Sequence, residues 1–275
     1  MNVYLRNNIK IIGKGSHTVV LSHGFGCSQT MWRYIAPALA KHFTVILYDL
    51  VGSGESSLAM YDYQKYDTLD GYASDLLEII DEVSDGPVIF VGHSVSASIG
   101  LLASIARPDL FLYQIMVSPS PCFINHDGYV GGFSASDIEE LCQTLDSNYL
   151  GWSSSMAPVI MGVPERPELG EELTNSFCRT DPNIAQHFAR VTFFADNRAA
   201  LPQCFTDTLI LQCSDDFIAP SSVGEYMLAT MPKAELVLLN NDGHCPHMST
   251  PDACLEAMFN YLNKATPSIG LRNVC

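Results

Sequence analysis

The sequence is poor in positive charge. Lys and Arg total 14 against 30 Asp and Glu, which gives a net charge of −16 at pH 7. No basic cluster is present to meet phosphate groups, so the sequence argues against nucleic acid and anionic membranes as partners. It also lacks an apolar run near the roughly 18 residues that span a bilayer, and residues 1–15 lack a cationic start followed by a long apolar stretch. We therefore expect a soluble, non-exported, cytoplasmic protein.

Paired cysteine spacing is missing as well. The nine cysteines are an odd number and are spread along the chain. Reduced thiols, mostly buried as small apolar side chains, are favoured over a disulfide framework. The stretch His244-Cys245-Pro246-His247 has no carboxylate to complete a metal site. Residues 49–57 contain two glycines but no following Lys-Ser/Thr, so a tight loop is favoured over a phosphate cradle. We predict no metal and no cofactor.

Apolar runs of strand length alternate with segments of helical spacing along most of the chain. With 47% apolar residues, the 275-residue chain can bury a large core. This alternation predicts an α/β fold with a mostly parallel sheet and helices on both faces. The eight predicted strands are residues 2–5 and 8–12 (a hairpin), 18–22, 44–48, 88–92, 114–117, 208–213 and 235–239. The predicted helices outside the long insertion described next are residues 29–41, 69–83, 95–106, 223–230 and 251–264.

Residues 120–201 interrupt the alternation after the sixth predicted strand. The segment has no strand-like run and is far longer than an ordinary connection. Its helical patterns cover residues 136–149, 152–161, 167–178 and 182–194. Helices inserted here lie over the carboxyl ends of the strands, where ligands bind in such sheets. We predict a four-helix lid on a core made of residues 1–119 and 202–275. A second domain that folds on its own is the alternative, but about 80 residues in four short helices would hardly hold a core.

Residues 88–100, VIFVGHSVSASIG, join an apolar run to small residues that suit a helix. A sharp turn between a strand and a helix presents a serine hydroxyl clear of the backbone, and this arrangement suits a nucleophile. Ser94 occupies the nucleophile position of the pattern G-x-S-x-G, although Ser96 stands where the pattern has its last glycine. The alternative is an ordinary turn with a capping serine.

An acid follows one of the later strands. In this architecture the catalytic groups come in the chain order nucleophile, acid, base. Asp215 and Asp216 come directly after strand 208–213. Asp216 is favoured because Pro220 follows it at the spacing common after the acid in these enzymes, and Asp215 is expected to cap the turn.

A base follows the last predicted strand. His244 comes after a glycine on the loop that leaves strand 235–239, whereas His247 begins the next helix. His244 is therefore predicted to take the proton of Ser94, with a carboxylate to fix its tautomer and stabilise the imidazolium. His247 is expected at the pocket rim or in packing.

Two backbone N–H groups are candidates for an oxyanion hole. Val95 directly follows the nucleophile, and Phe25 lies in the His-Gly-Phe-Gly stretch after the third predicted strand. The Phe25 ring can line the pocket at the same time. His93 is expected to pack beneath the nucleophile, and Cys245 is expected to be a buried thiol.

Aromatic side chains are frequent in the insertion, and only two or three of them are expected to face the cavity. The insertion aromatics are Phe123, Tyr129, Phe133, Trp152, Phe177, Phe188, Phe193 and Phe194. The residues predicted to line the pocket are Phe123, Phe133, Phe194, Ile218 and His247. Such a wall favours a small, largely apolar ligand with one polar reactive centre.

Several motifs resemble one group of α/β-hydrolases. GHSVSASIG, HGFGCSQTMW, YDLVGSGESS and GHCPHMSTPD are similar to the RsbQ-like family, which includes a bacterial stress regulator and the plant strigolactone and karrikin receptors. Segments of the insertion such as FCRTDPNIAQHFARVTFFADNR extend the resemblance over nearly the whole chain. The resemblance implies Ser94, Asp216 and His244 as the triad, Phe25 and Val95 as oxyanion donors, and an enclosed apolar pocket under four helices. It also implies a signalling partner such as a PAS-domain phosphatase.

Two functions are therefore weighed. The first is a serine hydrolase that cleaves a small ester or lactone through an acyl-enzyme. The second is a signalling module in which ligand binding or slow hydrolysis moves the lid and recruits a protein. Haloperoxidase or dehalogenase chemistry is disfavoured, since a dehalogenase needs a carboxylate where this chain has Ser94.

Overall fold

A seven-stranded sheet forms the centre of the protein. The structure is a computed structural model that describes residues 2–265. Within that range the strand order is β1-β3-β2-β4-β5-β6-β7, and every neighbouring pair is parallel except β1 and β3. The strands are β1 (Lys10–Ile12), β2 (Thr18–Ser22), β3 (Thr44–Leu47), β4 (Val88–His93), β5 (Phe111–Val117), β6 (Thr208–Asp215) and β7 (Ala234–Asp242).

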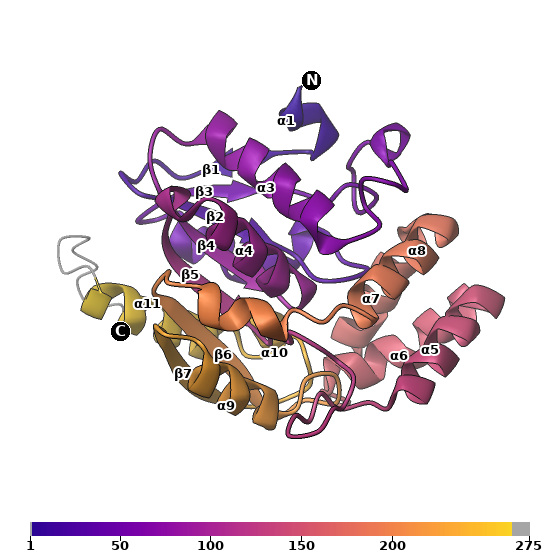
Figure 1. Ribbon diagram of the computed structural model, residues 1–275. Coiled ribbons are helices and arrows are strands. Elements are labelled where there is room, and N and C mark those ends of the chain that lie inside the picture. The colour runs from indigo at the N-terminus through magenta and orange to yellow at the C-terminus, as the bar shows by residue number, and fades with distance from the viewer. Residues whose placement is uncertain (1, 266–275) are drawn as a thin grey trace.

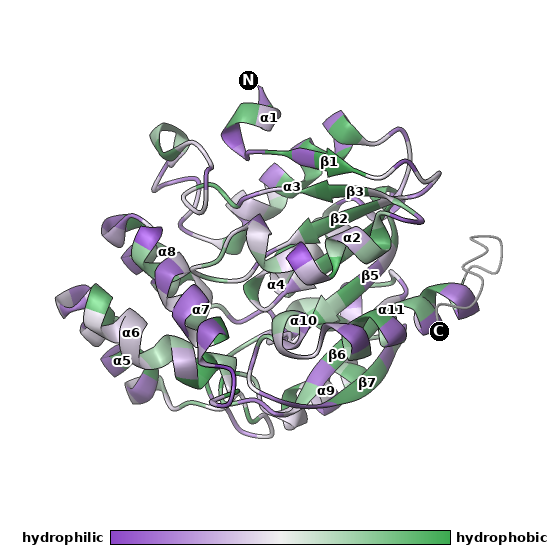
Figure 2. Cartoon of the chain, turned by 180° about the vertical axis from the view of Figure 1, so that it is seen from behind, coloured by the Kyte–Doolittle hydropathy of each residue, from purple (hydrophilic) through white to green (hydrophobic). Residues whose placement is uncertain are grey.

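Helices cover both faces of this sheet, as expected for parallel strands that are buried on each side. Helices α3, α4 and α9 pack on one face, and α2 and α11 pack on the other (Figures 1 and 2). The bounds are α1 (Val3–Arg6), α2 (Ala36–Leu39), α3 (Leu69–Val83), α4 (Val95–Ala106), α9 (Ser221–Thr230), α10 (Pro246–Ser249) and α11 (Pro251–Ala265). Four short 3₁₀ turns are Gln29–Tyr34, Leu58–Met60, Pro108–Leu110 and Arg198–Gln203.

The predicted N-terminal hairpin is wrong, and the sheet has seven strands in the described range instead of eight. The first segment forms the short helix α1 because the side-chain oxygen of Asn2 accepts hydrogen bonds from the backbone N–H groups of Tyr4 and Leu5. Val3 and Arg6, three residues apart, are the buried residues of this turn. β1 pairs with β3 and has no hairpin partner before it.

The predicted helix at residues 29–41 is also broken. It consists of a 3₁₀ turn, Gln29–Tyr34, followed by the single-turn helix α2. Pro37 has no backbone N–H to donate to the carbonyl oxygen four residues earlier, so the two pieces do not form one continuous helix. The Ser28 side chain caps the first piece by accepting from the N–H of Thr30.

Four helices fill the insertion between β5 and β6: α5 (Ala135–Ser147), α6 (Tyr149–Met161), α7 (Pro167–Arg179) and α8 (Pro182–Phe193). They gather on one side of the molecule, beside the sheet (Figure 1). Their buried aromatic and aliphatic side chains form one apolar cluster with residues of the sheet loops, among them Cys27, Ile218 and Cys245. The insertion therefore packs on the core as part of it. Among residues 2–265, no helix has the length and apolar character needed to cross a membrane.

Candidate active site

Ser94 sits at a sharp turn between β4 and α4. Its backbone has φ 55° and ψ −121°, a conformation that is sparsely populated for a residue with a side chain. The turn is held because the Ser94 N–H donates to the carbonyl oxygen of Val117 at 2.9 Å. Gly92 is required beside it, since a Cβ at that position would lie 2.6 Å from the backbone oxygen of Ser96. This is the geometry of a nucleophile elbow.

Ser96, the departure from the usual motif, has a structural role. Its hydroxyl donates to the carbonyl oxygen of His23 at 2.5 Å and accepts from the hydroxyl of Ser22 at 2.8 Å. The Ser22 hydroxyl also lies 2.7 Å from that of Tyr48. A buried chain of hydroxyls therefore connects the elbow to the loop after β2, a connection that a glycine could not make.

Three predicted residues meet at the carboxyl ends of β4, β6 and β7. His244 Nε2 lies 2.7 Å from Ser94 Oγ, and His244 Nδ1 lies 2.7 Å from Asp216 Oδ2. All three are almost fully buried, with exposed fractions of 6% for Ser94, 4% for His244 and 5% for Asp216. The arrangement places an acceptor nitrogen on the serine hydroxyl and a carboxylate on the opposite ring nitrogen, as proton transfer from the serine requires.

The two neighbouring aspartates have different environments. Asp216 turns inward, and its Oδ1 accepts from the backbone N–H groups of Ile218 at 2.8 Å and Ala219 at 3.1 Å. Asp215 ends β6 and is exposed. Asp216 lies one residue past the end of β6, where these two N–H groups hold its carboxylate and its Oδ2 reaches His244.

His247 does not reach Ser94. Its ring stacks 4.6 Å from the Trp32 ring and 4.4 Å from the His93 ring, in a fully buried layer under the triad. Burial, together with the neighbouring His244 and Arg33, lowers the pKa of His247 to about 3. Burial likewise holds the pKa of His93 well below its usual value. Both rings are therefore neutral at pH 7.

The two predicted oxyanion donors lie near the nucleophile: Val95 follows Ser94 in the chain, and Phe25 lines the same cavity as Ser94. Val95 opens α4, where the first N–H groups have no partner inside the helix. Among residues 2–265, the Phe25 N–H donates to no other group. Both residues adjoin the enclosed cavity around Ser94 or its turn, so two N–H groups are available for a developing negative charge.

The cavity around Ser94 is narrow and aromatic. Its volume is about 30 Å³. Three aromatic rings pack around the Phe25 ring. The distances from its centroid are 5.7 Å to Phe193, 6.0 Å to Phe177 and 6.3 Å to Trp152. The apolar lining residues are Phe25, Trp152, Ile160, Leu173, Phe177, Phe193 and Ile218. A ligand must displace side chains or move the insertion to enter.

Most of the predicted pocket residues lie elsewhere. Ile218 lines the cavity, but Phe194 is 42% exposed and borders a surface hollow on α8 instead. One residue along a helix turns the side chain by about 100°, so Phe193 faces inward and Phe194 does not. Phe123 packs behind Phe193, with ring centroids 5.2 Å apart.

The remaining predicted aromatic also lies outside the cavity. Phe133 packs against Phe217, with ring centroids 5.6 Å apart. Trp152, Phe177 and Phe193 are the insertion aromatics that do line it. They carry no distinguishing sequence signal, because the inward face is set by how the helices pack on one another.

Two cysteines line the cavity without offering a second nucleophile. Cys27 and Cys245 are buried and free. Burial raises the pKa of both thiols far above the usual value, so neither forms a thiolate near neutral pH.

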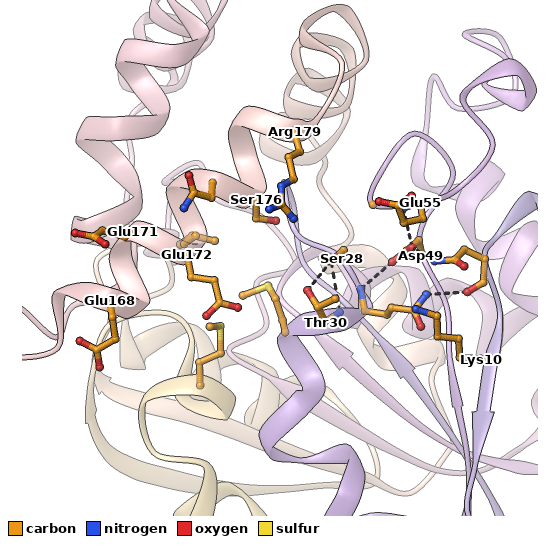
Figure 3. Close-up of a pocket in the computed structure, with 17 residues that line it drawn as sticks. Lys10, Ser28, Thr30, Asp49, Glu55, Glu168, Glu171, Glu172, Ser176 and Arg179 are labelled. Atoms are coloured by element: carbon orange, nitrogen blue, oxygen red, sulfur yellow. Dashed lines mark hydrogen bonds between the residues drawn. The ribbon is translucent and has the colours of Figure 1, made fainter.

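A larger, polar hollow of about 530 Å³ lies between α7 and the core loops. Figure 3 shows Glu168, Glu171 and Glu172 on α7 on one side and Lys10 and Thr30 on the other. None of the triad residues borders it. It holds no pair of nucleophile and base, so its size does not make it the site of chemistry.

Within residues 2–265, one group of side chains has the spacing to hold a metal ion. Ligand atoms of Cys122, His126 and Asp196 lie within 4.8 Å of one another. Asp196 already pairs with Arg198 through two hydrogen bonds of 2.6 and 2.8 Å, and a cation would have to displace that guanidinium. None of the three residues lines the cavity around Ser94.

Comparison with known proteins decides the family. The Alpha/beta hydrolase family matches residues 19–257 of the chain. The chain belongs to the α/β-hydrolase family. It is 36% identical over 258 residues to the Karrikin insensitive 2 receptor CA of Petunia hybrida, covering 94% of this chain and 96% of that one. It is 34% identical over 267 residues to the strigolactone esterase D14 of Arabidopsis thaliana, covering 97% and 98%.

A solved α/β-hydrolase structure is similar over nearly its full length. A hydrolase from Oleispira antarctica shares 43% identity with this chain, with a TM-score of 0.93 and coverage of 95% of this chain and 96% of that one. The expected α/β-hydrolase fold is thereby confirmed. The resemblance to plant receptors is likewise confirmed, and membership of the narrower RsbQ-like group stays a prediction.

Proposed function

We propose that this α/β-hydrolase cleaves a small, largely apolar ester or lactone through an acyl-enzyme on Ser94. The observation that carries the proposal is the continuous hydrogen-bonded line from Ser94 Oγ through His244 to Asp216 at the wall of an enclosed cavity. Removing a proton from a buried serine needs such a neutral base within hydrogen-bond reach.

In the first half-reaction, His244 Nε2 takes the Ser94 proton as Oγ bonds to the carbonyl carbon. The N–H groups of Phe25 and Val95 stabilise the oxyanion that forms. His244 then donates its proton to the leaving oxygen, and the alcohol departs or, in a lactone, stays attached as a hydroxyl. In the second half-reaction a water gives its proton to His244 as it attacks the acyl carbon. His244 then returns that proton to Ser94 Oγ as the bond between Oγ and the acyl carbon breaks, and the acid is released. Asp216 stabilises the imidazolium in both halves.

The insertion would act as the lid of this site. Helices α6, α7 and α8 contribute Trp152, Phe177 and Phe193 to the cavity wall. The α7 helix is tied to the core because Arg33 donates to Glu172 at 2.5 and 2.6 Å, and Ser176 donates to the carbonyl oxygen of Gly26 at 2.8 Å. An apolar wall with few polar atoms suits a compact apolar substrate.

Labelling by a fluorophosphonate tests the proposal. The wild-type protein is expected to be labelled at Ser94, and Ser94→Ala is expected to abolish labelling with an unchanged circular dichroism spectrum. Ser154→Ala, which removes an exposed serine of α6, is the control and is expected to label like the wild type. A Ser94→Ala protein that labels at the wild-type rate would overturn the proposed nucleophile.

A second candidate function is ligand sensing. It is favoured by relatives over more than nine-tenths of the chain, one of which is a karrikin insensitive 2 receptor. In that case binding or slow hydrolysis would move the lid and recruit a protein, such as a PAS-domain phosphatase. Many turnovers of p-nitrophenyl esters support the hydrolase role. Slow turnover together with a ligand-dependent rise in melting temperature supports the sensor role.

A further inference from the structure

Thr192, on α8 of the insertion, lines the same cavity as Ser94. Its side chain is 1% exposed, and its hydroxyl oxygen has no hydrogen-bond partner among residues 2–265. Burying a hydroxyl costs free energy because its hydrogen bonds to water are lost, and here no hydrogen bond to the protein replaces them.

The usual local solution is absent at this position. A helical threonine can donate to the carbonyl oxygen four residues earlier. Thr174 does so to Gly170 at 2.9 Å, and Thr230 does so to Tyr226 at 2.7 Å. Thr192 makes no such bond in the described chain. Its donor is therefore left for a group that enters the cavity.

Several other polar side-chain atoms of the cavity already have hydrogen-bond partners. Ser94 and His244 bond each other, and Cys27 donates to the carbonyl oxygen of Phe25 at 3.2 Å. His93 Nδ1 has no partner either, but it is packed against Gly24, where a Cβ would lie 2.5 Å from it. His93 Nδ1 lies against the backbone at Gly24, whereas Thr192 belongs to α8 of the insertion.

We infer that the Thr192 hydroxyl binds a second oxygen of the substrate, separate from the carbonyl that Ser94 attacks. This inference rests on the proposed hydrolase function and narrows its substrate class. The preferred substrate is an ester or lactone that carries a further acceptor oxygen, such as a ketone, ether or second carbonyl. A site with one such donor rejects an apolar analogue, because the analogue leaves the hydroxyl unpaired.

Matched pairs of esters test the inference. In p-nitrophenyl 4-oxopentanoate and 4-methylpentanoate, a ketone oxygen in the first stands where the second has a methyl group. A second pair, 5-oxohexanoate and 5-methylhexanoate, moves the oxygen one carbon further. For each pair the ratio of kcat/KM is measured in wild type, Thr192→Val and Thr192→Ser. Valine keeps the shape of threonine without the hydroxyl, and serine keeps the hydroxyl.

The wild type is expected to favour the oxo-ester of at least one pair by about tenfold, a preference that Thr192→Val loses and Thr192→Ser retains. Equal ratios in wild type and Thr192→Val for both pairs overturn the inference. Hydrolysis that survives Ser94→Ala overturns the proposed function instead, so the two failures are distinguishable.

Binding gives a readout that needs no turnover. In a Ser94→Ala background the dissociation constants of the same esters are measured by fluorescence of Trp152, which lines the cavity. Adding Thr192→Val is expected to raise the dissociation constant of the oxo-ester by about tenfold and to leave that of the methyl-substituted ester unchanged. An equal rise in the dissociation constants of both esters indicates a change of cavity shape and contradicts the inference.

Discussion

The His93 ring donates a hydrogen bond from Nε2 to the backbone carbonyl oxygen of His244, 2.8 Å away. His93 ends β4, one residue before the nucleophile, and His244 lies on the loop that leaves β7. The strand that carries Ser94 therefore also holds the backbone of its proposed base. The bond is buried, so its loss leaves a carbonyl oxygen without a partner.

His93 is thus expected to be a positioning residue. His93→Phe removes the donor and is expected to lower kcat for a p-nitrophenyl ester about 10- to 100-fold with little change in KM. His93→Gln keeps a side-chain N–H and is expected to recover most of the loss. Steady-state kinetics compare kcat and KM of the two variants with those of wild type, and circular dichroism verifies that both variants fold. A His93→Phe enzyme with the kcat of wild type contradicts the assignment.

The two adjacent aspartates give a matched test of the acid. Asp216→Asn keeps the shape of the side chain but removes the charge that faces His244 Nδ1, and is expected to lower kcat about 10²- to 10⁴-fold. Asp215→Asn alters an exposed side chain and is expected to stay within about twofold of wild type. The reverse order of the two effects would show that the wrong aspartate is assigned.

Chain order made the site predictable from sequence. Ser94, Asp216 and His244 each follow a predicted strand, and the carboxyl ends of parallel strands meet at one edge of a sheet. No knowledge of side-chain packing is needed to bring the three loops together. The structure accordingly places their side chains within hydrogen-bond distance.

The cavity wall could not be predicted in the same way. Phe193, the last residue of α8, and Phe194, which follows it, are identical neighbours, and only the packing of the four insertion helices decides which one turns inward. The helix α1 was missed for a different reason. Its four residues are apolar enough for a strand, and a single capping side chain, Asn2, decides their conformation.

Buried neutral histidines predict a loss of stability in mild acid. The folded-state pKa of His247 is lowered to about 3 from the usual 6.5, so between these values the unfolded chain binds more protons than the native one. The free energy of unfolding therefore falls as pH decreases through 6.5. For His247 alone the loss from pH 7.5 to 5.5 is about 1.4 kcal/mol.

Replacing His247 isolates its share of this loss. Neither ring nitrogen has a hydrogen-bond partner in the described chain, and a phenylalanine keeps the stacking on Trp32 and His93. His247→Phe is expected to change stability at pH 7.5 by less than about 1 kcal/mol and to reduce the difference between pH 7.5 and 5.5 by about 1.4 kcal/mol. Urea unfolding of wild type and His247→Phe at pH 7.5 and at pH 5.5 measures these free energies of unfolding. If His247→Phe leaves the difference in the free energy of unfolding between pH 7.5 and 5.5 unchanged, the pKa of His247 is not lowered in the folded protein.

The end of helix α6 bears directly on the proposed base. Gly162, with φ +71°, meets Gly243 so closely that a Cβ on Gly162 would lie 2.5 Å from the Gly243 Cα. Next to this contact, the His244 N–H donates to the carbonyl oxygen of Ile160 at 2.8 Å. Close packing of two glycines therefore sets the distance between the insertion and the loop that carries His244.

Gly162→Ala is expected to push that loop away, and Gly128→Ala is its control. Gly128 has a similar φ of +76° but nothing within 4 Å of an added Cβ, so both variants carry the backbone strain and only one carries the clash. The free energy of unfolding of Gly162→Ala, measured in urea, is expected to be lower than that of Gly128→Ala by about 1–3 kcal/mol. A fluorophosphonate is expected to label Ser94 about tenfold more slowly in Gly162→Ala than in Gly128→Ala. Equal stability and equal labelling of the two variants would mean that the contact between the insertion and the loop does not position His244.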